Sequence, residues 1–229
     1  MANAQLTWLG HGTFKLETPG GKVILVDPWL EGNPKSPANA EPERIDLILV
    51  THGHFDHIAD AVRLANAHKA PIVCGYELSL WFATQGAAQV NGHGKGSRNT
   101  YGDLTISITN AFHSSSTPDG AYAGEPLGFV VRLEDGRSIY FSGDTCVFGD
   151  MALIRRLHAP TIAVLPIGNV YTMDPIEAGL AAELLGVQTV VPGHWGTFPA
   201  LDGTPEELRK HVPAGVTVLS PEPGVAVAI

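Results

Sequence analysis

Cysteine is almost absent from this chain of 229 residues, which contains only Cys74 and Cys146. Two cysteines are too few for a disulfide scaffold, and a chain of this length does not need one to hold its core together. We therefore expect two free thiols and a reducing compartment. With 44% hydrophobic and 16% charged residues, the composition is that of a compact globular protein rather than a disordered one.

The sequence also lacks an excess of basic residues and a long hydrophobic run. Its 14 Lys and Arg are outnumbered by 23 Asp and Glu, and the formal net charge is -9. Such a chain repels a polyanion, which makes nucleic acid a poor expectation for a partner. No apolar run approaches the roughly 18 residues of a membrane span, and the N-terminus lacks the pattern of a signal peptide. We expect a cytoplasmic protein that binds neither nucleic acid nor membrane; a homo-oligomer is left open.

Short segments rich in Val, Ile and Leu alternate with Gly, Pro and Asp and with helical patterns, which is typical of an α/β chain. Neither a repeat nor a long linker divides the sequence, so its length favours one domain over residues 1–229. The segments expected to be strands are 22–26, 47–50, 72–73, 104–109, 128–132, 138–141, 162–165, 189–191 and 216–219.

The sequence predicts four helices, and two of them carry clear N-terminal signals. Asp174, Pro175 and Glu177 supply an N-cap residue, a first-turn proline and a capping-box acid, and Gly186 ends that helix. The same device begins a second helix at Thr204. Further helices are expected over residues 57–68 and 149–157. The Gly-rich segment 91–97 is the best candidate for a flexible loop.

His and Asp side chains follow four of the expected strands. Ligands in α/β folds gather at the carboxyl ends of strands, so we expect side chains in these positions to meet in one site. A cluster of four follows the strand at 47–50, and one candidate follows each of the strands at 104–109, 138–141 and 189–191. The seven candidates are His52, His54, Asp56, His57, His113, Asp144 and His194.

Five histidines and two aspartates are more ligands than the four that saturate a structural zinc site, and none of them is Cys. The number suits two ions. Imidazole and carboxylate favour zinc, manganese or iron, and they leave open positions for water and substrate. The pattern therefore predicts a catalytic site with two divalent ions, zinc first, with manganese or iron as alternatives.

The segment His52-Gly53-His54-Phe55-Asp56-His57 resembles the HxHxDH signature of the metallo-β-lactamase superfamily, whose fold is a four-layer αββα sandwich of two sheets flanked by helices. Segments 8–14, 111–116, 142–145, 166–168 and 171–173 resemble a subgroup of small metal-dependent hydrolases similar to the ascorbate-phosphate lactonases. The resemblance covers nearly the whole chain. It implies this fold and a hydrolase that acts on a small cytosolic substrate, such as a lactone or a phosphorylated sugar derivative.

The resemblance further implies how the seven ligands divide. One ion would be held by His52, His54 and His113, and the other by Asp56, His57 and His194. Asp144 would bridge the two ions. Segments 168–170 and 194–198 depart from the pattern, because relatives more often carry Asp after the Gly and Tyr-Asn after the His. These departures leave the identity of the substrate open, but they do not affect the predicted metal ligands.

Two cations about 3.5–4 Å apart lower the pKa of a bridging water and polarise the electrophile, so the nucleophile is a hydroxide rather than a side chain. Asp56 could orient that water or return the proton to the leaving group, although a ligand carboxylate is a compromised base. His11, between Gly10 and Gly12, is a further catalytic candidate as proton donor or substrate contact. The alternative is a structural, hydrogen-bonded histidine.

Candidates for contacting the substrate lie in the less familiar segments of the chain. His93 could contact an anionic substrate group, and the alternative is that it lies in a solvated loop. Thr172 and Met173 could line the pocket, and the alternative is that they only pack. The candidates are His93, Asn169, Thr172, Met173 and Trp195.

Three other functions compete with a small-molecule hydrolase. A phosphodiesterase or nuclease on the same scaffold would need a basic strip or arm, which the sequence does not show. A redox protein with two irons normally needs a flavin partner domain, for which this length leaves no room. A non-catalytic metal-binding module would be expected to lack a ligand, and all seven are present.

Overall fold

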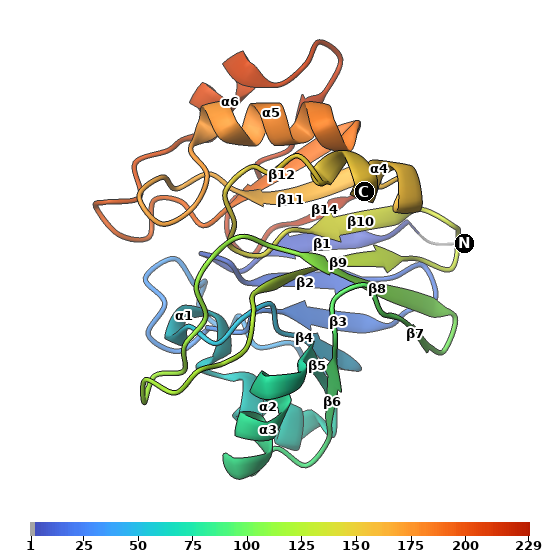
Figure 1. Cartoon of the computed structure of the whole chain (residues 1–229), viewed down its shortest axis with the longest axis vertical. Helices are drawn as coiled ribbons and strands as arrows, with labels where there is room; N and C mark the ends of the chain where they lie inside the picture. The colour runs from blue at the N-terminus through green and yellow to red at the C-terminus, as the bar shows by residue number, and fades with distance from the viewer. Residues whose placement is uncertain (1–2) are drawn as a thin grey trace. The chain divides into compact units, whose positions relative to one another are not determined.

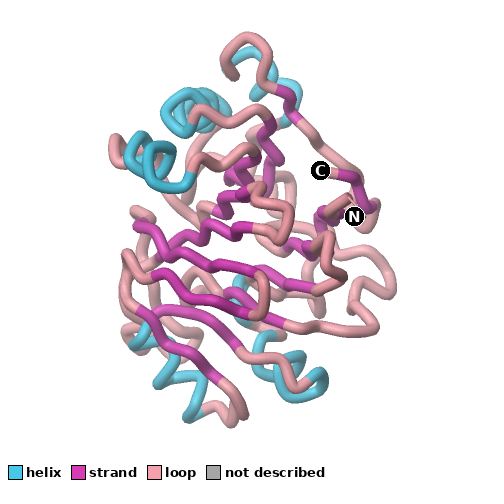
Figure 2. Tube along the Cα trace, turned by 90° about the vertical axis from the view of Figure 1, so that its right-hand side faces the viewer, coloured by secondary structure: helices cyan, strands magenta, loops and turns pink. Residues whose placement is uncertain are grey.

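A computed structural model describes residues 3–229, which divide into two compact units. Unit 1 consists of residues up to 95 together with 114–126 and 221–229, and unit 2 consists of residues 96–113 and 127–220. Each unit contains a seven-stranded sheet. The two sheets are flanked by helices, which Figure 2 shows in cyan beside the magenta strands. The prediction of one domain over residues 1–229 stays a prediction.

The sheet of unit 1 joins an antiparallel half to a parallel half (Figure 1). Its order is β14-β1-β2-β3-β4-β5-β6. The strands from β14 to β3 pair antiparallel, and those from β3 to β6 pair parallel, so that β3, β4, β5 and β6 end at the same edge. The strands are β1 (Gln5–Trp8), β2 (Phe14–Glu17), β3 (Val23–Val26), β4 (Leu47–Leu49), β5 (Ile72–Gly75), β6 (Val90–His93) and β14 (Ala226–Ala228).

Three helices belong to unit 1: α1 (Phe55–Ile58), α2 (Ala61–His68) and α3 (Tyr76–Thr84). Helices α2 and α3 pack against the parallel half of the sheet, where Leu64 and Phe82 are fully buried beside Ile48. The predicted helix over 57–68 is confirmed over α2, including its end at His68, but the prediction of one continuous helix is wrong, because the chain breaks between α1 and α2. At Asp60 the backbone N–H donates to the Pro28 carbonyl at 3.0 Å instead of to the carbonyl four residues earlier, and the carboxylate accepts the N–H groups of Leu30 at 2.7 Å and Glu31 at 3.0 Å.

Unit 2 has the sheet order β13-β12-β11-β10-β9-β8-β7. Strands β7 to β10 pair antiparallel and β10 to β13 pair parallel. The strands are β7 (Arg98–Tyr101), β8 (Leu104–Asn110), β9 (Leu127–Arg132), β10 (Ser138–Phe141), β11 (Ile162–Pro166), β12 (Thr189–Gly193) and β13 (Thr217–Val218). The helices are α4 (Met151–His158), α5 (Pro175–Leu185) and α6 (Pro205–His211).

The capping signals identified in the sequence are confirmed in unit 2. The Asp174 carboxylate accepts the Glu177 backbone N–H at 2.8 Å, and Gly186 ends α5 with a left-handed φ of 62°. The Thr204 hydroxyl accepts the Glu207 N–H at the start of α6. These local devices fix the ends of helices whose apolar faces cover β11 and β12.

The prediction of a flexible loop over 91–97 is wrong in its first half, because Val90–His93 forms β6. This segment pairs in parallel with the buried β5, with Val73 opposite Asn91 and Gly75 opposite His93. Backbone pairing to a buried neighbour outweighs the polar, Gly-rich side-chain pattern. Gly92 permits it, since a Cβ at this position would lie 2.2 Å from Oγ of Ser79.

Among residues 3–229, no helix is both long and apolar enough to cross a membrane.

Candidate metal centre

The HxHxDH segment forms the turn that connects β4 to α1 in unit 1. Its start is fixed by Thr51, whose backbone N–H and hydroxyl both donate to the Asp27 carboxylate at 2.7 Å. Gly53 lies against the 114–126 segment: a Cβ there would be 2.4 Å from Cβ of Ala123, and its N–H donates to Oγ of Ser115 at 3.1 Å. A side chain at position 53 would therefore displace the histidines on either side.

The first ligand set of unit 1 is the pair His52 and His54. Nε2 of His52 lies 3.0 Å from Nδ1 of His54, and the two ring centroids are 4.6 Å apart. His52 is buried at 1% exposure, while His54 is partly open. Two imidazole nitrogens that lie this close together can both bind one metal ion.

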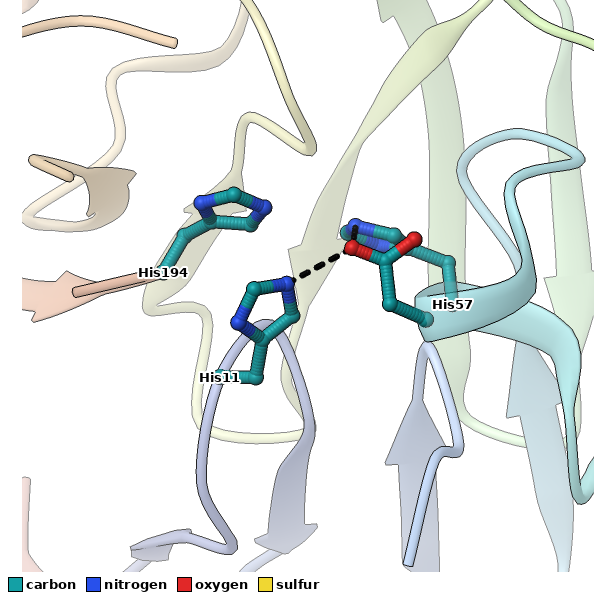
Figure 3. Close-up of side chains that lie close together, drawn as sticks. His11, His57 and His194 are labelled. Carbon is teal, nitrogen blue, oxygen red and sulfur yellow. Dashed lines mark hydrogen bonds and ion pairs between the residues drawn. The ribbon is translucent and has the colours of Figure 1, made fainter. Parts of the chain in front are cut away.

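The second ligand set contains Asp56 and His57, with His11 beside them. One ligand atom from each of these three residues lies within 4.8 Å of the others. Nε2 of His11 donates to Oδ2 of Asp56 at 2.8 Å, the contact dashed in Figure 3, and Nε2 of His57 lies 3.9 Å from the same oxygen. The His52 and His57 rings are only 4.2 Å apart, so the two sets adjoin on one turn.

His11 is fully buried, and its backbone has the left-handed φ of 53° that follows Gly10 at 96°. Its carbonyl accepts the Trp8 indole N–H at 2.9 Å. This strained loop turns the imidazole toward Asp56. The structure thus places His11 in the site of unit 1, and its role as a proton donor stays a prediction.

Asp27 is a residue of this site that the sequence analysis missed. It follows β3 directly, is 2% exposed, and its Oδ2 lies 2.8 Å from Nδ1 of His57. A carboxylate only accepts hydrogen bonds, so the proton of His57 lies on Nδ1 and the lone pair on Nε2. Metal-binding histidines are oriented in this way by an outer carboxylate. The signal was available, because Asp27 occupies the same strand-end position as the predicted ligands.

Unit 2 brings together the other three predicted ligands. His113 follows β8, Asp144 follows β10 and His194 follows β12. Oδ2 of Asp144 lies 3.1 Å from Nε2 of His194 and 3.7 Å from Nε2 of His113. One carboxylate oxygen is thus shared between two imidazoles.

Backbone contacts hold this second group in place. The Phe112 N–H donates to Oγ1 of Thr145 at 3.0 Å, and the Cys146 N–H donates to the Phe112 carbonyl at 3.2 Å. These bonds join the turn carrying His113 to the loop carrying Asp144. On the other side, a Cβ at Gly168 would lie 2.0 Å from the His194 carbonyl oxygen, so only glycine fits there.

The donor chemistry of both units fits divalent metal ions. The ligand atoms are imidazole nitrogens and carboxylate oxygens, which suit zinc, manganese and iron. No thiolate belongs to either described group. Cys74 is buried, and burial raises the pKa of its thiol well above the usual range. The outer carboxylate Asp27 completes the arrangement expected around a ligand histidine.

The predicted substrate residues occupy different environments. His93 ends β6 half-buried, and burial lowers the pKa of its imidazole. Met173 is fully buried in the core of unit 2, in keeping with the packing alternative, and its N–H donates to the Thr145 carbonyl at 3.1 Å. That bond ties the loop carrying Asn169 and Thr172 to the loop that carries Asp144.

One of these residues, Asn169, has an unusual backbone conformation that its neighbour shares. Asn169 has a left-handed φ of 67°, followed by Val170 at 60°. Val170 and Tyr171 expose 60% and 62% of their surface. Trp195 is partly buried against the core of unit 2. None of these placements assigns a substrate contact, so those roles stay predictions.

A sequence profile described as the beta-lactamase superfamily domain matches residues 22–195 of this chain. The chain is 46% identical over 211 residues to a "UPF0173 metal-dependent hydrolase" of Solibacter usitatus, covering 91% of this chain and 92% of that protein. It is 49% identical over 216 residues to one of Rubrobacter xylanophilus, covering 92% and 89%. The chain therefore belongs to the beta-lactamase superfamily and, within it, to the UPF0173 family of metal-dependent hydrolases.

A solved structure supports the same conclusion. Igni18, described as a novel metallo hydrolase from the archaeon Ignicoccus hospitalis, is 34% identical, with a TM-score of 0.89 over 100% of this chain and 99% of that one. The isothiocyanate hydrolase from Delia radicum gut bacteria, at 22% identity and a TM-score of 0.75 over 98% of each chain, shares the fold. The predicted family and the α/β, metallo-β-lactamase-like fold class are confirmed.

Proposed function

We propose that this protein hydrolyses a small molecule with two divalent metal ions, most simply zinc. One observation carries the proposal: the turn at 52–57 presents two adjoining ligand sets. The nitrogens of His52 and His54 converge at 3.0 Å, and His57 lies beside Asp56 with its Nδ1 bonded to Asp27. A structural site for one ion would need only a single set of this kind.

The three ligands of unit 2 complete the proposed centre. Family membership supports the division that the resemblance implies, in which His113 would join the first ion, His194 the second, and Asp144 would bridge them. Within unit 2, the support is the single Asp144 oxygen that lies within 3.7 Å of both imidazoles. When bound, the two ions supply an activated water and a Lewis acid for the bond under attack.

The side chains of the chain itself supply orientation and proton transfer. Asp27 accepts the Nδ1 proton of His57. This bond keeps the ring in the tautomer whose Nε2 lone pair is available to a metal ion. Nε2 of His11 donates to Oδ2 of Asp56 at 2.8 Å. This hydrogen bond orients the carboxylate and places a transferable proton beside it. Asp56 and His11 therefore form the pair that we propose to pass a proton to the leaving group.

We propose a lactone, another cyclic ester or a phosphorylated sugar derivative as the substrate class. The support is the resemblance of segments 8–14, 111–116 and 142–145 to lactonase-like hydrolases. Two free thiols support a cytoplasmic location.

The test is a hydrolase panel of lactones, phosphodiesters, carboxylic esters and amides. Protein stripped with a chelator is assayed before and after addition of Zn²⁺ or Mn²⁺, and bound metal is counted by elemental analysis. We expect two ions per chain, turnover only in loaded protein, and the highest rate on a lactone. Full activity in metal-free protein would sink the mechanism, and preference for a phosphodiester would move the proposal to the phosphodiesterase alternative.

Variants separate ligand loss from general damage. His54→Ala and Asp144→Ala are expected to abolish turnover and lower the metal content while circular dichroism stays native. His211→Ala is the matched control, because this histidine is exposed at the end of α6, its ring bonds Glu207 of the same helix, and alanine keeps the Cβ that lies against Gly179. Native metal content in both ligand variants would exclude the dinuclear centre and leave a non-catalytic module in consideration.

A further inference from the structure

Unit 2 contains a cavity of about 210 Å³ on one face of its sheet, where strands β7 to β10 meet the end of α4. Two arginines, one histidine and three hydroxyl side chains provide its polar lining. They are Arg98, Arg132, His158, Thr105, Ser107 and Ser138.

The strand register explains why these side chains meet. Arg132 pairs with Thr105 on one side and with Ser138 on the other. Ser107 pairs in the same way with Arg98 on β7 and with a valine on β9. Alternate residues of a strand face the same side, so these two neighbouring rows share one face of the sheet. Each row contributes one arginine.

The cavity is separate from the ligands of unit 2. Ser138 lies at the amino end of β10, whereas Asp144 follows its carboxyl end. At about 3.3 Å per residue, Ser138 and Phe141 at the two ends of this strand are roughly 10 Å apart. Thr105 likewise lies near the start of β8, and His113 follows its end. A molecule in the cavity would therefore contact other side chains than the metal ligands.

The charge in the cavity is unbalanced. Its lining contains three basic side chains and no Asp or Glu among the described residues, although the whole chain has a net charge of -9. The pKa of His158 is lowered, first by burial and then by the positive charge of Arg98. Arg98 and His158 therefore repel each other when both are charged, and an anion bound beside them would offset that repulsion.

Helix electrostatics account for only part of this cluster. Arg155, Arg156 and His158 occupy the last turn of α4, where positive charge interacts favourably with the helix dipole. Arg98 and Arg132 lie on strands, and the dipole gives them no reason to face the same cavity. Both side chains are exposed, and Nε of Arg98 donates to Oγ of Ser107 at 3.4 Å, so the two guanidinium groups line a cavity that solvent and small anions can reach.

We propose that this cavity is a second ligand site, which binds a phosphate group, either as inorganic phosphate or as the phosphate of a small metabolite. Its volume is below the roughly 300–1,000 Å³ of pockets for drug-sized ligands. Two guanidinium forks and an imidazole would reach a tetrahedral oxyanion from several directions. The hydroxyls of Ser107 and Ser138, each 5% exposed, add donors at the floor. A carboxylate would be satisfied by one fork alone.

The test uses the full chain with its metals, at fixed ionic strength, and follows the His158 ring by NMR while inorganic phosphate or glycerol 3-phosphate is added. The resonance is assigned by its loss in His158→Gln. We expect saturable shifts and a rise in the pKa of His158, because the bound anion favours imidazolium. Saturation by inorganic phosphate identifies the free ion as sufficient, and saturation by the ester alone identifies a phosphorylated metabolite. Phosphate bound at the metal centre would leave this ring unshifted.

Variants make the result specific. Arg98→Ala and Arg132→Ala should each weaken phosphate binding about tenfold or more, since a charge-assisted hydrogen bond is lost. Arg132→Lys should give an intermediate loss, because it keeps the charge without the fork. Arg156→Ala is the control: this residue is exposed on α4 and lies outside the lining. The proposal is overturned if neither probe shifts His158 saturably, if both alanine variants bind as wild type, or if the control weakens binding equally.

Discussion

Nδ1 of His57 donates to Oδ2 of Asp27 at 2.8 Å, and both side chains are almost fully buried. The same carboxylate also accepts the N–H and the hydroxyl of Thr51. One aspartate at the end of β3 therefore fixes both the residue that precedes the ligand turn, Thr51, and the ring of its last residue, His57. It connects the fold of the sheet directly to the geometry of the metal ligands.

Replacing this aspartate should weaken metal binding without removing a ligand. In Asp27→Asn the amide accepts with one atom only, so the His57 tautomer is no longer enforced. We expect metal affinity to fall about 10–100-fold, the range seen when such outer partners are lost. Competition with a zinc-selective chelator measures this. Asp46→Asn, a surface carboxylate of the same unit that bonds the Val23 N–H, is the control. Equal affinity in both variants would contradict the orienting role of Asp27.

Removal of metal should lower the stability of the folded chain. A ligand that binds only the native state stabilises it by about 2.7 kcal/mol at a concentration 100 times its dissociation constant. We expect the melting temperature to fall after chelation and to recover with Zn²⁺. The recovery should be smaller in His54→Ala. A melting temperature that is unchanged by chelation, in protein shown to lose its metal, would be inconsistent with the proposed centre.

The sequence predicted those parts of the molecule that are encoded locally. The N-caps Asp174 and Thr204 act within four residues, so the starts of α5 and α6 were predicted, and Gly186 also marked the end of α5. The ligands were found because polar residues after apolar strands form a repeated pattern. The family signature then supplied the division between the two ions, which spacing alone did not.

The missed elements depend on distant contacts. Helix α3 follows Gly75 without a side-chain cap, and it exposes the apolar Tyr76 and Leu80 besides burying Leu78 and Phe82, so no amphipathic pattern marks it. Strand β6 owes its conformation to pairing with β5. Asp27 was overlooked because a lone Asp before Pro28 reads as a turn residue. Its strand-end position marked it as a candidate, but its role as the partner of His57 depends on a contact between residues thirty positions apart.

The two cysteines should differ sharply in reactivity. Cys146 is exposed, whereas Cys74 is completely buried and burial raises the pKa of its thiol. An alkylating reagent at neutral pH should modify one thiol in the native protein and two after unfolding, as counted by mass spectrometry. The raised pKa of Cys74 also determines how its contribution to folding stability changes with pH. The protonated thiol favours folding fully below the ordinary cysteine pKa of about 8.5, and this contribution is lost as the pH rises above that value. Rapid modification of Cys74 in folded protein would contradict its burial.

Gly168 provides a test of the second ligand group that changes no ligand. A Cβ at this position would lie 2.0 Å from the His194 carbonyl oxygen and 3.2 Å from Cδ2 of Leu201, so Gly168→Ala must displace the backbone that carries His194. Such overpacking costs about 1–3 kcal/mol. We expect a lower melting temperature, and because His194 moves relative to Asp144, we also expect metal content to fall. Gly149→Ala is the matched control in the same unit, since a Cβ there would meet no atom within 4 Å. A Gly168→Ala protein that melts and binds metal like this control would show that the position of His194 does not depend on the close approach at Gly168.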